Sequence, residues 1–289
     1  MNKAAEIIEF FIHNEEDPGL VVRGRVCIPV DGPRKISPVI IAPGFLGFAD
    51  WGFYPHLAEK LLRSGYAALL FNYSTGGVGK SGKPYSDLKN LKRMTISHDL
   101  NDLNLIYNYI STDKTLSQKI DCENIGLIGH SKGGGVAIIH AKFNPAVKAI
   151  ITINGIARFQ RIPQEKVNRI IKRGSHEIQL NGMLNKFRFK ADFWEDIEKN
   201  KDRYDILKAL KKINAKCLFI QGERDDKVGV SEAGELHFVA GEKSDLMIIE
   251  LADHNFGCDV FCSRLSDLAD RTLDKAVQWL DKNIRNIPK

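Results

Sequence analysis

The sequence predicts an α/β fold, in which a mostly parallel sheet is covered by helices on both faces. Apolar runs of strand length recur along the chain, and amphipathic segments of helix length separate most of them. The later runs are almost continuously apolar, as in strands that are buried on both faces. The chain has 289 residues, of which 43% are hydrophobic and 27% charged, and this suits one large globular domain.

The first half of the chain predicts an antiparallel ribbon followed by alternating strands and helices. The ribbon consists of strands over 7–13 and 20–30, joined by a stretch rich in turn-forming residues. The elements expected next are a strand over 39–42 that ends in a glycine loop, a helix over 54–65, a strand over 66–71, a long loop over 72–84 and a helix over 95–110. Asp99 and Asp102 lie on the last helix, where a solvated face is expected for both.

The second half continues the alternation, with one interruption. The expected elements are a strand that begins at 125, a helix over 136–143, a strand over 147–154, a helix over 205–213, a strand over 216–221, a helix over 231–239, a strand over 246–251 and a helix over 268–284. Residues 1–289 are thus interpreted as a single domain. Residues 156–200 break the rhythm, hold no convincing buried strand and are strongly basic, so we expect an inserted cap there.

Composition excludes several classes of function. Lys and Arg total 42 against 36 Asp and Glu, a net charge of +6, and these residues are spread along the chain rather than gathered with aromatics, so no nucleic-acid partner is expected. No signal peptide or run of 18 apolar residues is present, which predicts a cytoplasmic protein with no membrane partner. The five cysteines are odd in number and lie mostly in apolar runs, so reduced core thiols are expected, and neither a metal nor a cofactor. The sequence does not set the oligomeric state.

The stretch Gly129-His130-Ser131-Lys132-Gly133 has the form G-x-S-x-G and follows the apolar run that begins at Ile125. A strand, a sharp turn with this sequence and a helix are typical of a nucleophile elbow. Such a turn holds the serine in a strained backbone conformation and lifts its hydroxyl above the sheet, beside the free N–H groups of a helix N-terminus. Ser131 is therefore the candidate nucleophile, and the neighbouring His130 is interpreted as a packing residue.

A serine nucleophile needs a base, and the base needs an acid that orients it. In an open parallel sheet, both are expected in loops that follow strands at the carboxyl edge. His254 lies just past the final strand and is the candidate base. Asp225 and Asp226 follow the preceding strand, and Asp225 is favoured as the acid because it lies at the apex of its loop. Asp253, adjacent to the base, is expected to be a turn residue.

The oxyanion hole is expected to combine two backbone N–H groups. One belongs to Lys132, the residue after the nucleophile, whose side chain need not take part. The other belongs to Phe45, which follows Gly44 in the glycine loop after the strand over 39–42.

With these motifs the chain resembles the α/β-hydrolase superfamily over nearly its whole length, and more narrowly the dienelactone-hydrolase-like and cinnamoyl-esterase-like (feruloyl-esterase-like) group. The stretches that carry the resemblance are 42–53, 71–73, 129–135, 222–225 and 253–257. Two positions depart from these relatives. Pro43 stands where they usually have a histidine that helps to shape the oxyanion loop, and Ser131 stands where true dienelactone hydrolases have a cysteine.

The resemblance and the candidate triad imply a serine hydrolase that cleaves small-molecule carboxylic esters. The same residues could cleave a peptide or a thioester, and some proteins of this fold bind ligands with little turnover. The cap adds a further hypothesis, because nine Lys or Arg and two Glu lie between Ile156 and Lys190. These charges are expected either to form a solvated face or to turn one or two side chains inward toward an acidic group of the substrate.

Overall fold

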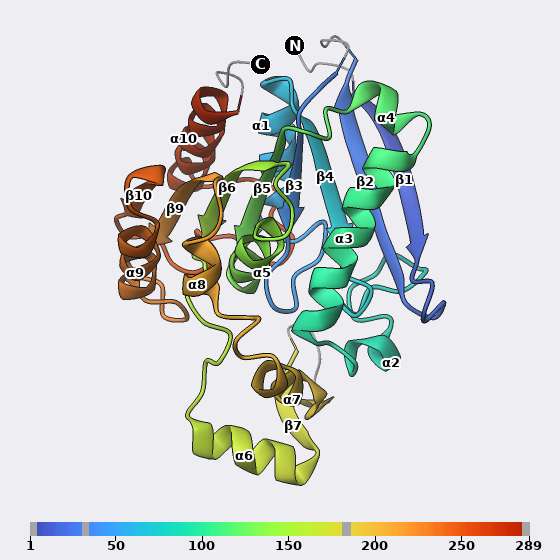
Figure 1. Cartoon of the computed structure of the whole chain (residues 1–289), viewed down its shortest axis with the longest axis vertical. Coiled ribbons are helices and arrows are strands. Elements are labelled where there is room, and N and C mark those ends of the chain that lie inside the picture. The colour runs from blue at the N-terminus through green and yellow to red at the C-terminus, as the bar shows by residue number, and fades with distance from the viewer. Residues whose placement is uncertain (1–4, 31–34, 181–185, 285–289) are drawn as a thin grey trace.

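The computed structural model describes residues 5–30, 35–180 and 186–284, and its centre is an eight-stranded sheet with helices on both faces (Figure 1). The strands lie in the order β1-β2-β4-β3-β5-β6-β9-β10. β2 is antiparallel to both of its neighbours, and all the other pairs are parallel. The predicted α/β class and the antiparallel ribbon are therefore confirmed.

The strands of the main sheet are β1 (Ala5–His13), β2 (Val21–Pro29), β3 (Pro38–Ala42), β4 (Ala67–Asn72), β5 (Ile125–His130), β6 (Val147–Ile153), β9 (Lys216–Gly222) and β10 (Ser244–Ile249). The helices are α1 (Tyr54–Arg63), α2 (Leu88–Leu91), α3 (Ile96–Thr112), α4 (Leu116–Lys119), α5 (Lys132–Ala141), α6 (Gln164–Arg173), α7 (Asp192–Lys199), α8 (Ile206–Leu210), α9 (Val230–Ala240) and α10 (Asp267–Asn283). Within the described ranges, no helix is long and apolar enough to cross a membrane.

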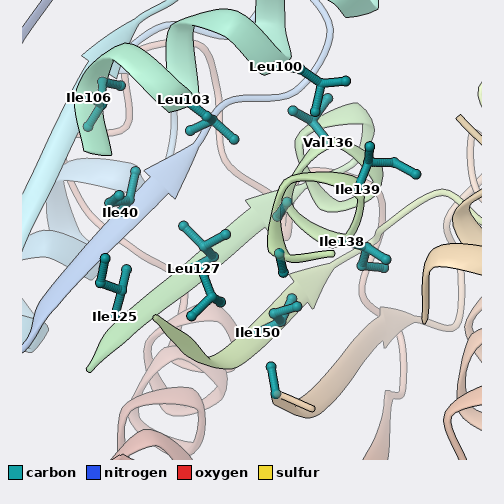
Figure 2. Packing of buried hydrophobic residues seen from close by; sticks show 14 of the residues in the cluster. Ile40, Leu100, Leu103, Ile106, Ile125, Leu127, Val136, Ile138, Ile139 and Ile150 are labelled. Carbon is teal, nitrogen blue, oxygen red and sulfur yellow. The ribbon is translucent and has the colours of Figure 1, made fainter. Parts of the chain in front are cut away.

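Two hydrophobic layers hold the helices on the sheet. α1 and α10 cover one face, while α3, α5, α8 and α9 cover the other. In Figure 2, Leu103 of α3 lies over Leu127 of the central strands, and Val136 of α5 lies beside Leu100 of α3. Burying one such side chain contributes about 1.5–3 kcal/mol, so these layers fix the central strands and with them the loops at their carboxyl ends.

The expectation that Asp99 and Asp102 lie on a solvated face is wrong, because both carboxylates are buried on α3. Asp99 forms an ion pair with Lys132, with 2.5 Å between Oδ2 and Nζ. Asp102 accepts hydrogen bonds from the backbone N–H of Ser74 at 2.7 Å and from its hydroxyl at 3.0 Å. Helical periodicity reveals the apolar stripe of α3, but it cannot reveal polar partners that come from distant parts of the chain.

The described part of segment 156–200 lies outside the main sheet, beyond the carboxyl ends of its strands (Figure 1). It contains α6, α7 and a separate antiparallel hairpin of β7 (Ser175–Gln179) and β8 (Lys186–Lys190). Residues 181–185 of the expected cap lie outside the described residues. The hairpin was not predicted, although Phe187 and Phe189 alternate with charged residues in β8, a period of two that is typical of a strand buried on one face.

Candidate active site

Ser131 lies between β5 and α5 with φ 53° and ψ −118°, a backbone conformation that non-glycine residues rarely adopt. The residues two positions before and two positions after Ser131 must be glycines, because other backbone segments approach them so closely. A Cβ on Gly129 would lie 2.4 Å from the carbonyl oxygen of Gly133, and one on Gly133 would lie 2.2 Å from that of Ala42. The structure thus contains the sharp strand-to-helix turn that the G-x-S-x-G sequence predicts.

The loops after β9 and β10 bring Asp225 and His254 together. The Nδ1 of His254 lies 2.7 Å from the Oδ2 of Asp225, whose side chain is fully buried. The other oxygen of Asp225 accepts the backbone N–H groups of Lys227 and Val228, at 2.8 and 2.9 Å. Asp226 instead points to solvent and pairs with the ammonium of Lys227 at 2.8 Å.

Asp225 is held in its ionised form. Burial raises its pKa, but the hydrogen bonds from His254 and from the backbone outweigh burial, so the pKa is lowered overall. An ionised carboxylate can only accept hydrogen bonds, and therefore Nδ1 of His254 carries the proton that it donates. A general base needs a free acceptor nitrogen, and with the proton on Nδ1 that nitrogen is Nε2 of His254.

Two cavities meet at Ser131. One, of about 340 Å³, is lined by both Ser131 and His254, together with Trp51 and Tyr85. The other, of about 240 Å³, is lined mainly by apolar side chains, namely Phe45, Ile156, Phe159, Ile162, Phe193, Trp194 and Val228. A bound molecule could therefore extend from Ser131 in two directions of different chemical character.

Phe45 and Lys132, the expected oxyanion donors, both line the apolar cavity with Ser131. Neither backbone N–H has a hydrogen-bond acceptor among the described residues. Gly44, which precedes Phe45, lies so close to the elbow that a Cβ there would be 3.3 Å from the Cβ of Ser131. The arrangement leaves two N–H groups near the nucleophile for a developing oxyanion.

Sequence reasoning missed a set of polar side chains that support these loops. Asn154, at the end of β6 with φ 51°, donates its amide hydrogens to the carbonyl oxygens of Asp253 and His254, at 3.1 and 2.8 Å. Its Oδ1 accepts the N–H of Gly222 at 2.7 Å, so it joins the acid and base loops. The available signal was an asparagine, which tolerates the left-handed region, directly after a core strand.

His130 packs as expected, stacked on Trp51 with ring centroids 5.2 Å apart. It also forms hydrogen bonds with the hydroxyl of Tyr54 and with the carbonyl of His254, which the sequence did not predict. Asp253 is the predicted turn residue, because its Oδ1 accepts the N–H groups of Asn255 and Gly257.

Of the nine basic residues counted in the cap, Arg161 is the one that lines a described cavity at Ser131. Its guanidinium already donates to the carboxylate of Glu232 and to the carbonyl of Lys227. Arg158 and Arg188 form exposed pairs with Glu235 and Glu177. Most of the cap charge is therefore on a solvated surface.

The chain was compared with protein-family models, with curated sequences and with solved structures. A family model described as BAAT / Acyl-CoA thioester hydrolase C terminal matches residues 111–237, and no curated protein sequence matches the chain. Est1E from Butyrivibrio proteoclasticus has 15% identity and a TM-score of 0.69, with 96% of this chain and 99% of that chain covered.

Two further solved structures are similar. The esterase domain of a Rhodothermus marinus protein has 19% identity and a TM-score of 0.64, with 96% of this chain and 99% of that chain covered. Dienelactone hydrolase from Anabaena variabilis ATCC 29413 has 17% identity and a TM-score of 0.64, with coverages of 97% and 99%. At these identities the likeness establishes a shared fold over almost the whole chain.

Proposed function

We propose that this chain, which belongs to the α/β-hydrolase superfamily, is a serine hydrolase that cleaves carboxylic esters through an acyl-enzyme on Ser131. One observation carries the proposal. His254, hydrogen-bonded to the buried Asp225 at 2.7 Å, lines the same cavity as a serine held in an elbow conformation.

In the proposed reaction, Nε2 of His254 takes the proton of the Ser131 hydroxyl as the oxygen attacks the substrate carbonyl. Asp225 holds the imidazole in the required tautomer and stabilises the imidazolium that forms. The N–H groups of Phe45 and Lys132 stabilise the oxyanion of the tetrahedral intermediate. The imidazolium then protonates the leaving alcohol, and water, activated by the same histidine, releases the acid from Ser131.

The two cavities at Ser131 would bind different parts of the ester, the alcohol group in one and the acyl group in the other. His254 must hand its proton to the leaving group, so the alcohol occupies the cavity of about 340 Å³ that this histidine lines. The acyl group then extends into the apolar cavity of about 240 Å³. We expect a preference for apolar acyl groups, because the side chains that line this cavity are mainly apolar.

A thioester is the second candidate substrate, and the match to the BAAT / Acyl-CoA thioester hydrolase C terminal model favours it. The matched residues, 111–237, include Ser131 and Asp225. The same nucleophile, base and oxyanion donors would serve either bond, because both reactions pass through a tetrahedral oxyanion.

The test is a parallel assay of p-nitrophenyl esters, acyl-CoA thioesters and aminoacyl anilides with matched acyl groups. The proposal predicts the highest kcat/KM on the esters and loss of turnover in the folded Ser131→Ala variant. Higher kcat/KM on the thioesters would select the second candidate. Hydrolysis that survives Ser131→Ala would contradict the mechanism for both.

A further inference from the structure

A continuous chain of buried and partly buried hydrogen bonds joins the oxyanion loop to the loop of the base. The N–H of Gly44, directly before Phe45, lies 3.2 Å from the hydroxyl oxygen of Tyr54. The same oxygen lies 2.9 Å from Nδ1 of His130, and Nε2 of His130 lies 3.0 Å from the carbonyl oxygen of His254. Two side chains thus span the distance between the two loops.

The direction of each hydrogen bond is fixed by chemistry. The carbonyl of His254 can only accept, so Nε2 of His130 carries a proton and donates it. Burial lowers the pKa of His130 to about 3, so the ring is neutral and its Nδ1 accepts. The hydroxyl of Tyr54 must then donate to Nδ1, while its oxygen accepts from Gly44. Every donor in the chain has an acceptor.

The two side chains are also held rigidly. Both are buried, and the His130 ring is stacked on Trp51 and meets Phe53 edge-on, with centroids 5.4 Å apart. Tyr54 meets Phe53 edge-on as well, at 5.1 Å. This close-packed aromatic cluster restricts the tilt of both rings and so helps to set the separation of the two loops.

We infer that Tyr54 and His130 are positioning residues, which fix the N–H of Phe45 and the ring of His254 relative to one another for the reaction at Ser131. The inference rests on the proposed function, because it assigns those two groups to oxyanion binding and proton transfer. Neither side chain is assigned to the reacting atoms themselves; each acts through the backbone that it holds.

Tyr54→Phe is the direct test, because it removes one oxygen and keeps the ring. Gly44 and Nδ1 of His130 would both lose their partner, and displacement of catalytic groups by about 1 Å can cost about 100-fold in rate. We expect kcat to fall about 10- to 100-fold with KM within about twofold, because the lost contact matters most in the transition state. Affinity for a boronic acid, which mimics the tetrahedral oxyanion, should fall by a similar factor.

Tyr73→Phe is the matched control. Tyr73 is equally buried near the elbow, but its hydroxyl has no hydrogen-bond partner among the described residues. We expect kcat and boronic acid affinity within about twofold of the unmodified protein. A second pair of variants addresses the other ring: His130→Gln, which can keep the donor toward the His254 carbonyl, should retain more activity than His130→Leu.

The rate of Ser131 acylation by a fluorophosphonate separates the possible failures. Labelling of the unmodified protein with about tenfold slower labelling of folded Tyr54→Phe supports the inference. Equal labelling rates, or equal losses in Tyr54→Phe and Tyr73→Phe, would overturn it and leave the proposed function standing. A lowered melting temperature with unchanged kinetics would reduce the pair to a structural role. No labelling of the unmodified protein would overturn the proposed function itself, and the inference with it.

Discussion

The carboxyl edge of the sheet and the cap segment 156–200 both hold charged side chains that contact polar partners, but their environments differ. Asp225 is fully buried where it meets His254, and Lys132 and Asp99 are 5% and 0% exposed. In the cap, Arg188 and Glu177 are 69% and 49% exposed. Water and salt weaken the attraction between exposed charges. A buried charge that loses its partner cannot be solvated by water instead, so the loss is costly. Substitutions should therefore matter greatly at the edge and little in the cap.

The largest contrast is expected inside one loop. Asp225→Asn should lower kcat by roughly 10⁴-fold, because the amide no longer stabilises the required imidazole tautomer or the imidazolium. Asp226→Asn removes an exposed carboxylate that pairs with Lys227, and kcat should stay within about twofold. Steady-state kinetics of the two folded variants make the comparison. The reverse ranking would move the acid by one residue.

The second contrast concerns stability. Lys132→Met keeps the backbone N–H but leaves Asp99 buried without its cation, which should lower the free energy of unfolding by about 3–5 kcal/mol. Arg188→Met in the cap should leave the urea midpoint unchanged. The double variant Lys132→Met/Asp99→Leu should regain much of the lost stability, since neither charge of the pair remains. Equal midpoints for both single variants would contradict the contrast.

The sequence predicts those parts of the candidate site whose residue types are required by the backbone geometry. Ser131 can be located because its turn demands glycines at fixed spacing, and Asp225 and His254 because loops after parallel strands share one edge. The partners of α3 cannot be located in this way. Asp99 and Asp102 meet Lys132 and Ser74 only after the sheet has formed, and no local pattern encodes such contacts.

The Tyr54–His130 chain was missed for the same reason, since its four groups come from separate elements. β8 was missed for a different one. Its Phe187 and Phe189 are buried at alternate positions as in a strand, but the three basic residues that alternate with them are exposed and give the stretch the composition of a loop.

A third test uses pH. Burial raises the pKa of Asp102 to about 8, whereas a free aspartate has a pKa of about 3.9. Between these values the unfolded chain has lost the proton and the folded chain keeps it, so the contribution of Asp102 to stability falls as pH rises, by about 1.4 kcal/mol per unit. Asp102→Asn should remove this slope.

Urea unfolding at pH 5, 6.5 and 8 gives the free energy of unfolding of Asp102→Asn and of the unmodified protein. The value for Asp102→Asn minus the value for the unmodified protein should increase as pH rises. Glu177→Gln, in the exposed cap pair, should show no trend over the same range, because the lowered pKa of Glu177 keeps it ionised throughout. A difference for Asp102→Asn that does not vary with pH would contradict the assignment.

The smallest effect is expected for the cap charges on substrate choice. Arg161 lines the apolar cavity, but Glu232 and the Lys227 carbonyl already accept its hydrogen bonds. Matched esters with and without a distal carboxylate should therefore differ less than about threefold in kcat/KM at low salt. A preference of tenfold or more for the anionic ester that survives partly at about 0.5 M salt would reveal a desolvated basic contact.

The central claim is that Ser131, activated by His254, is the nucleophile, and intact-protein mass spectrometry after fluorophosphonate treatment tests it most directly. The account predicts one adduct per chain, which peptide mapping of the digested protein should locate on the peptide that contains Ser131. That adduct should be absent from Ser131→Ala and form far more slowly in His254→Ala. An adduct on another residue, or esterase activity that persists when Ser131 stays unmodified, would contradict the account.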